Sequence, residues 1–283
     1  MTLFAGKTAL VFGVANEWSL ATEIGRALHR EGATLGFAHL PGERMAQRVR
    51  QATEGLGARF YVPCDLRSDE DIDAALGRAR AELAAVDVLI HSVAYAPASA
   101  LHAVFSRTTR ADFQTALDVS TYSLIALARA AEPVLSPGGA IITLSYLGAR
   151  KVVHGYNVMG VAKAGLECAV RLLAWELGRA KGIRVNGVSA GPVETLAMRG
   201  VTGWDRLLAD HRAKCPLGRN ITPSEVAGAA LFLCSPWASA ITGEVINVDA
   251  GYSIMAWAGD LSPMRSFAAT GLASPSAAAT TGR

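Results

Sequence analysis

Short apolar runs alternate along the chain with longer stretches in which apolar positions recur every three or four residues. The short runs predict buried strands, and the longer amphipathic stretches predict helices. Strands are expected at residues 8–12, 33–38, 59–62, 87–91, 140–144, 183–188 and 244–248. Helices are expected at residues 21–30, 45–56, 68–84 and 111–134, from about residue 156 onward, and at residues 223–233. Strands that alternate with helices in this way form a parallel sheet covered by helices on both faces.

This order of elements predicts the α/β fold class, as a single Rossmann-like, doubly wound parallel sheet with helices on both faces. We expect one domain over residues 1–258 and a flexible tail over residues 259–283, where Ala, Ser, Thr and Gly dominate. Residues 191–212 break the alternation with glycines around a small apolar helix. This pattern fits a segment that covers an apolar substrate, and it also fits an ordinary surface excursion.

Candidate binding residues directly follow several predicted strands. Ligands of such sheets bind beyond the carboxyl ends of the strands. One crevice should therefore collect Gly13, Asp65, Ser92, Val93, Tyr146 and Gly191. Ser19 is expected to cap the helix after Gly13, whose free N–H groups would suit a diphosphate. The glycine spacing is not G-x-G-x-x-G, so a plain strand-to-helix turn stays open, as does a helix cap or loop acid at Asp65.

A tyrosine and a lysine stand seven residues apart near the start of the long predicted helix. At about 100° per residue, Lys163 lies about 20° short of two full turns from Tyr156, so both are expected on one helix face about 10 Å apart. Met159 shares that face, and Gly160 leaves room for a close neighbour. A phenol donor and a cation so placed suit a carbonyl and a polyhydroxylated cofactor. The spacing alone also fits a chance alignment.

Composition narrows the classes of function. The 283 residues are 51% hydrophobic, and 27 basic against 24 acidic residues give a net charge of +3 without a long basic run. This argues against nucleic acid or a membrane surface as the main partner. The four cysteines show no metal-binding spacing, and no apolar run approaches the roughly 18 residues of a membrane span. We expect reduced thiols, no metal and a cytoplasmic location.

Two predicted helices are apolar on more than one side. Their apolar positions are Phe113, Leu117, Leu124, Ile125 and Leu127 in the first, and Val161, Leu166, Val170, Leu172, Leu173 and Leu177 in the second. A helix that covers a sheet needs one apolar stripe, so the second face is expected to pack against another subunit of a homo-oligomer.

Six motifs together resemble one enzyme family. They are G-V-A-N-E-W-S-L-A, H-S-V-A-Y-A-P, L-S-Y-L-G-A, Y-N-V-M-G-V-A-K-A, R-V-N-G-V-S-A-G-P-V-E-T-L-A and G-E-V-I-N-V-D-A-G. Over about residues 3–255 the chain resembles the enoyl-[acyl-carrier-protein] reductases of dissociated bacterial fatty-acid synthesis, a divergent branch of the short-chain dehydrogenase/reductase family. The Y-x6-K spacing is the most specific feature, because ordinary members place the lysine four residues after the tyrosine. Gly160 stands there in this chain.

The resemblance implies a dinucleotide site. Its residues would be Gly13, Ser19 and Leu20 at the phosphates, Leu40 at the end of the second strand, Asp65 and Leu66 at the adenine, Val93 by its backbone, Lys163 at the nicotinamide ribose, and Val193, Glu194, Thr195, Leu196 and Ala197 over the nicotinamide side. The implied cofactor is NADH. NADPH stays open, because His39 and Leu40 stand where many NAD enzymes carry an acid and Arg44 is a nearby candidate for a 2′-phosphate.

The resemblance also implies the reaction. Hydride would pass to the β-carbon of a trans-2-enoyl thioester, carried by acyl carrier protein or coenzyme A. Tyr156 would donate a hydrogen bond to the thioester carbonyl, Tyr146 would complete the catalytic pocket beside Lys163, and Ala96 and Met159 would contact the substrate. A tetramer is the implied assembly. Ala94 departs from the glycine common in these enzymes.

Two other functions compete with this interpretation. A carbonyl reductase or alcohol dehydrogenase of the same superfamily would need a tyrosine four residues before Lys163, where the chain has Met159. A non-catalytic dinucleotide sensor would have no need of the phenol donor.

Overall fold

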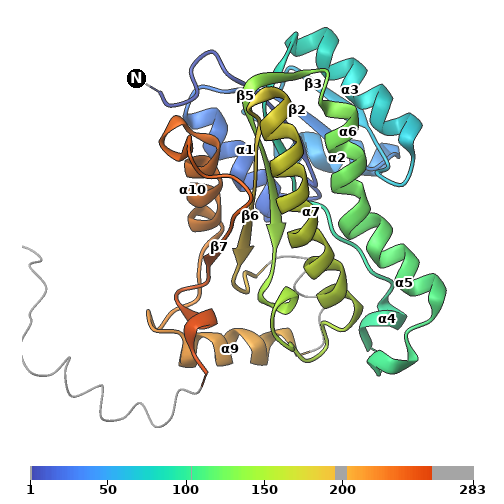
Figure 1. Ribbon diagram of the computed structural model, residues 1–283, viewed down its shortest axis with the longest axis vertical. Coiled ribbons are helices and arrows are strands. Elements are labelled where there is room, and N and C mark those ends of the chain that lie inside the picture. Colours follow the sequence, from blue (N-terminus) through green and yellow to red (C-terminus); the bar gives the residue numbers. More distant parts are fainter. Residues whose placement is uncertain (1, 103, 195–202, 257–283) are drawn as a thin grey trace, which may run out of the picture.

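The computed structural model describes residues 2–102, 104–194 and 203–256. They form a seven-stranded parallel sheet in the order β3-β2-β1-β4-β5-β6-β7 (Figure 1). Because the strand order reverses between β1 and β4, the predicted doubly wound, Rossmann-like fold is confirmed. The strands are β1 (Thr8–Phe12), β2 (Thr34–His39), β3 (Phe60–Pro63), β4 (Val86–His91), β5 (Leu135–Ser145), β6 (Arg184–Ala190) and β7 (Val245–Val248).

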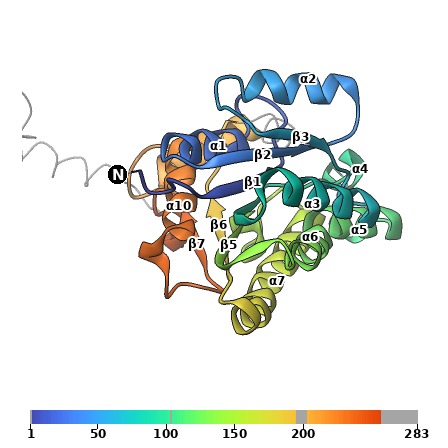
Figure 2. The same ribbon diagram turned by 90° about the horizontal axis from the view of Figure 1, so that it is seen from above.

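Helices cover both faces of the sheet (Figure 2). On one face lie α1 (Leu20–Arg30), α2 (Glu43–Ala52) and α10 (Pro223–Cys234), and on the other lie α3 (Asp69–Leu83), α6 (Ser123–Ala131) and α7 (Val158–Lys181). The remaining α-helices are α4 (Ala98–His102), α5 (Arg110–Leu117) and α9 (Trp204–Lys214). Figure 1 shows α4 and α9 beyond the end of the sheet at which the strands finish. Short 3₁₀ turns occupy Phe105–Arg107, Leu147–Ala149, Pro236–Ala238 and Tyr252–Ile254.

The strands are apolar on both faces because both faces are covered. In β1, Ala9 and Val11 pack into the layer with α1 and α10, whereas Leu10 and Phe12 pack into the layer with α3 and α7. Successive side chains of a strand point to opposite faces, so an unbroken apolar run is what such a strand requires. This packing fixes where β1 ends and therefore where the turn after it begins.

The predicted helix over residues 111–134 is interrupted. A π-helical turn at Asp118–Tyr122 separates α5 from α6, and α6 ends at Ala131. Side chains tie this turn to its neighbours: Thr121 Oγ1 donates to the carbonyl oxygen of Ala162 (2.7 Å), and Ser120 Oγ accepts from the N–H of Tyr95 (2.9 Å). Apolar periodicity did not reveal the interruption, because the π turn is short and is held by these hydrogen bonds to residues distant in the sequence.

The carboxyl end of α10 is closed by a buried arginine. The guanidinium of Arg184, at the start of β6, donates to four backbone carbonyl oxygens, those of Leu233, Cys234, Ser235 and Ala238. The last carbonyl groups of a helix lack intrahelical partners. Arg184 supplies those partners where water cannot reach.

Candidate active site

The candidate site lies where the strand order reverses, beyond the carboxyl ends of β1 and β4. Gly13 follows β1 with a φ of 100°, and a Cβ at this position would lie 2.0 Å from the carbonyl oxygen of Ser92, which follows β4. Only glycine permits so close an approach at this φ. Two cavities, of 460 Å³ and 410 Å³, share Gly13, Ser92 and Val93 among their lining residues. Tyr146 and Gly191 line the first cavity and Asp65 lines the second, so the predicted crevice at the strand ends is confirmed.

The turn into α1 is held by Ser19. Its Oγ accepts hydrogen bonds from the backbone N–H groups of Ala15 (3.2 Å) and Asn16 (3.1 Å). Ser19 occupies the N-cap position, but its hydroxyl caps no helical N–H, so the predicted side-chain cap is wrong. The hydroxyl oxygen instead accepts hydrogen bonds from N–H groups of the preceding loop. Leu20, the first residue of α1, lines the first cavity, so the positive end of the helix dipole lies at that cavity and would suit an anion.

The second cavity lies against the ends of β2 and β3. Leu40, Asp65 and Leu66 line it, as does Arg67, whose Nε donates to both carboxylate oxygens of Asp65 at 3.0 Å. Hydrogen bonding from Arg67 holds the pKa of Asp65 below its usual value. Arg44, the candidate for a 2′-phosphate, is not among the described residues that line this cavity.

Tyr156 precedes α7 instead of lying within it. The helix begins at Val158, and Asn157 has a φ of 39° and a ψ of −121°, a conformation that no helix contains. Two hydrogen bonds from Asn157 Nδ2 to the carbonyl oxygens of Ala100 (3.3 Å) and Leu101 (2.9 Å) in α4 hold this bend. The helical arc predicted between Tyr156 and Lys163 is therefore wrong, although both side chains do line the first cavity.

Two glycines seat the Tyr156 ring. A Cβ on Gly148 would lie 2.3 Å from Cδ1 of Tyr156, and a Cβ on Gly160 would lie 2.9 Å from the carbonyl oxygen of Gly148. The close neighbour expected at Gly160 is thus the turn that carries Gly148. The Tyr146 ring contacts the Tyr156 ring edge to face, with centroids 4.8 Å apart and an interplanar angle of 67°.

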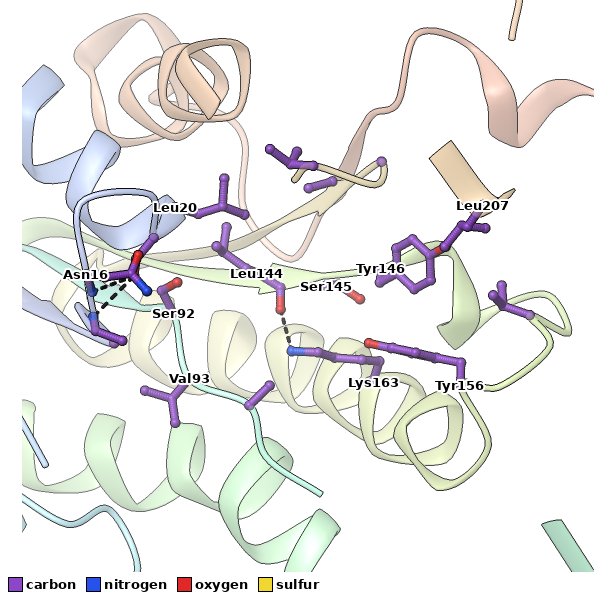
Figure 3. Close-up of a pocket in the computed structure, with 18 residues that line it drawn as sticks. Asn16, Leu20, Ser92, Val93, Leu144, Ser145, Tyr146, Tyr156, Lys163 and Leu207 are labelled. Atoms are coloured by element: carbon purple, nitrogen blue, oxygen red, sulfur yellow. Dashed lines mark hydrogen bonds between the residues drawn. The ribbon is translucent and has the colours of Figure 1, made fainter. Parts of the chain in front are cut away.

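Both phenols are protonated at neutral pH. Burial raises the pKa of Tyr146 to about 12, and burial followed by the neighbouring Tyr146 raises the pKa of Tyr156 above its ordinary value. Each hydroxyl can therefore act as a hydrogen-bond donor. Figure 3 shows the Tyr156 hydroxyl directed along the same side of the cavity as the Lys163 ammonium.

Lys163 is a buried cation at the floor of the cavity. Lys163 is only 5% exposed, and its Nζ donates a hydrogen bond to the carbonyl oxygen of Leu144 at 2.7 Å (Figure 3). Burial lowers the pKa of Lys163 to about 8, against the opposing effect of Glu167. Nearby His91 is buried between Thr143 and Ser123, and burial together with the Lys163 charge lowers its pKa to about 3. His91 is therefore neutral.

The other predicted site residues fall into three groups. Leu20 and Val193 line the first cavity, and Glu194 follows Val193 on the surface. Ala96 and Met159 line neither cavity; Ala96 packs against Ala100, Ala116 and Val158, and Met159 is buried with its sulfur 3.7 Å from Ser120 Oγ. Their substrate contacts stay predictions. Thr195, Leu196 and Ala197 lie outside the described residues.

Several lining residues have no role predicted from the sequence, although Asn16 and Ser145 lie within the motifs that carry the family resemblance. Asn16, Ser145, Val153 and Leu207 all line the first cavity. Leu207 belongs to α9, whose residues 204–212 fall within the predicted covering segment. Within the described residues no group of side chains is arranged to hold a metal ion. None of the helices in those same ranges has the length and apolarity to cross a membrane.

The fold is that of proteins that bind a dinucleotide across the switch point of their sheet, and the cavity at that point is lined by two phenols and a lysine. Residues 13–253 match the family model described as enoyl-(acyl carrier protein) reductase. The chain belongs to that family.

Individual relatives agree. An enoyl-[acyl-carrier-protein] reductase [NADH] from Nostoc sp. is 48% identical over 257 residues, which are 90% of this chain and 99% of the relative. The crystal structure of the Bacillus cereus enoyl-acyl carrier protein reductase with NADP⁺ and an indole naphthyridinone is 42% identical, with a TM-score of 0.88 over 91% of this chain and 100% of that one. The Anaplasma phagocytophilum reductase in complex with NAD is 40% identical, with a TM-score of 0.87 over 91% of this chain and 98% of that one.

Proposed function

We propose that this chain transfers hydride from NADH to the β-carbon of a trans-2-enoyl thioester, with Tyr156 stabilising the enolate that forms. The family makes it an NADH-dependent enoyl-[acyl-carrier-protein] reductase of fatty-acid synthesis. One observation carries the assignment of roles: the Tyr156 phenol and the Lys163 ammonium line one cavity, beside a glycine turn that admits a dinucleotide.

The residues present fit the cofactor. Gly13 and Ser92, whose close approach requires a glycine, line both cavities, and the start of α1 offers an N–H donor to a diphosphate. The second cavity, walled by Leu40, Asp65 and Leu66, suits the adenosine half. Lys163 would hold the ribose hydroxyls of the other half. Bound NADH supplies the hydride.

Tyr156 acts where charge develops. As hydride adds at the β-carbon, negative charge gathers on the thioester oxygen, and a protonated phenol already aimed at that oxygen stabilises it without reorganisation. The raised pKa of Tyr156 keeps the proton on the phenol, so the hydroxyl donates a hydrogen bond and does not act as a base at neutral pH. Tyr146 packs against its ring and limits the directions in which the hydroxyl can point.

Replacing Tyr156 with Phe tests this role. The variant keeps the ring contacts and loses the donor, so kcat should fall by about 10²- to 10³-fold while the Kd for NADH is unchanged. Turnover is followed by nicotinamide absorbance and binding by calorimetry. A wild-type kcat in this variant would show that the Tyr156 hydroxyl does not stabilise the enolate.

Substrate choice separates the competing functions. We expect oxidation of NADH with a crotonyl or longer trans-2-enoyl thioester, and none with a 3-oxoacyl thioester. The reverse result would favour the carbonyl reductase, and NADH binding without either reaction would favour the sensor. The same assay with acyl carrier protein and coenzyme A thioesters, and with NADPH, decides carrier and cofactor preference.

The assembly that we propose is a homotetramer. Trp175 and Leu172 of α7 are 74% and 64% exposed, and Ile125 of α6 and Val161 of α7 are also exposed, whereas Leu124 and Leu166 on the same helices are buried against the sheet. The second apolar face expected from the sequence is therefore present on both helices. A cytoplasmic location is supported by the four cysteines, all unpaired in the structure.

A further inference from the structure

Glu167 is a buried carboxylate that the proposed reaction leaves unused. It lies on α7, one turn after Lys163, and is 5% exposed. Its two oxygens accept hydrogen bonds from Ser145 Oγ and from Arg150 Nε, each at 2.8 Å. Burying a carboxylate costs free energy unless it is paired. The Arg150 side chain is 51% exposed. An ion pair with it could form at the surface, so this pair alone does not explain why the Glu167 carboxylate is buried.

Glu167 and Lys163 hold consecutive residues at the end of β5. Lys163 donates to the carbonyl oxygen of Leu144, and Glu167 accepts from the hydroxyl of Ser145. The next residue is Tyr146, which lines the cavity and packs against Tyr156. Side chains four residues apart share one helix face. One face of α7 thus holds the end of β5, which Tyr146 follows directly.

Glu167 is the carboxylate one helical turn after Lys163 on the same side of α7. His91 on β4 is neutral, and Tyr156 before α7 is protonated. Among the described residues, Glu167 is the group that favours the charged form of Lys163 against the effect of burial. Arg150 pairs with Glu167 from the solvent side of that carboxylate.

We propose that Glu167 is a positioning residue: it keeps the buried Lys163 charged and aligned on the end of β5, and so holds the ribose-binding cation ready for NADH. This inference rests on the proposed function in one respect, the role of Lys163 as the ribose ligand. It requires no contact between Glu167 and the cofactor.

The test is the Kd for NADH measured across neutral and alkaline pH. In the wild type, affinity should fall as Lys163 loses its proton, with a midpoint near pH 8. The ammonium is present below its pKa, so removing a negative neighbour moves the loss of affinity to lower pH. We expect Glu167→Gln, which retains the shape and the bond from Ser145, to lower the midpoint by about one pH unit.

Two variants separate charge from shape. Glu167→Asp keeps the charge and should keep the midpoint close to that of the wild type. Arg150→Gln breaks the ion pair and leaves the carboxylate, so its midpoint should not move down. A wild-type midpoint in Glu167→Gln, or an equal downward shift in Arg150→Gln, would overturn the proposal.

A stability measurement covers the case in which Glu167→Gln folds poorly. If the two charges balance each other, adding Lys163→Met to Glu167→Gln should raise the Tm, although Lys163→Met alone lowers it. Equal effects of Lys163→Met in both backgrounds would overturn the coupling. Loss of enoyl turnover with normal NADH binding would contradict the proposed function and leave this test intact.

Discussion

At the scale of single residues, the site depends on missing side chains as much as on those present. Gly13 lets the chain after β1 approach Ser92, and Gly148 lets the ring of Tyr156 lie close against its turn. Neither glycine carries chemistry. Their lack of a Cβ determines how closely the neighbouring backbone or ring can approach.

Gly148→Ala should reduce turnover without weakening NADH binding. The new Cβ would meet Cδ1 and Cε1 of Tyr156 at 2.3 and 2.7 Å, so the ring must move, and a displacement of about 1 Å of a catalytic group costs about 10²-fold in kcat. Steady-state kinetics and NADH titration check the two halves. Gly77→Ala on α3, where a Cβ meets nothing within 4 Å, is the matched control and should be neutral. Unchanged kcat in Gly148→Ala would mean that the ring of Tyr156 can take another position that is equally active.

Part of the site could be predicted from residues alone. Gly13, Asp65, Ser92 and Tyr146 follow apolar strands, and parallel strands end at one edge, so their gathering follows from topology. The bend at Asn157 could not be found in this way, because it depends on bonds to α4 carbonyls more than fifty positions earlier in the chain. Periodicity reports which face is buried and is blind to a single residue with positive φ.

At the scale of elements, most boundaries followed from apolar runs, and the exceptions are set by tertiary bonds. The π-helical turn between α5 and α6 is one, tied by Ser120 to Tyr95 and by Thr121 to Ala162. The start of α7 at Val158, set by the bonds from Asn157 to α4, is another. The end of α10 at Cys234 lies one residue beyond the predicted end, and Arg184 adds hydrogen-bond partners for its last carbonyl groups.

Arg184→Met should destabilise the protein by about 3 kcal/mol or more, because buried carbonyl groups lose a charged donor that nothing else replaces. Urea unfolding gives the free energy of unfolding. Arg78→Met, which removes a half-exposed pair with Glu82 at 2.9 Å, should cost less than about 1 kcal/mol. Similar losses in the two variants would show that the Arg184 contacts contribute little.

At the scale of the whole molecule, the two sides of α6 and α7 serve different purposes. Their inner sides, with Leu124 and Leu166, complete the core, and their outer sides present Ile125, Leu172 and Trp175 to solvent in the single chain. Soluble monomers rarely expose contiguous apolar patches, and these exposed side chains support the proposed assembly.

The double change Leu172→Glu and Trp175→Glu should therefore break the assembly. Placing two carboxylates in the apolar contact leaves them unpaired on burial. Analytical ultracentrifugation should find a smaller species than for the wild type. Leu217→Glu, at a position 63% exposed in a loop after α9, should leave the sedimentation unchanged. A double variant that sediments like the wild type would exclude this face as an interface.

The bend at Asn157 separates the loop that carries Tyr156 from the helix that carries Lys163. Lys163 is set by the register of α7, where losing one residue would swing the ammonium through about 100° and out of the cavity. Tyr156 stands before that register begins, at the end of a loop with no regular structure. Changes in residues 150–155 therefore act on the position of Tyr156, whereas Lys163 keeps the place that the register of α7 gives it.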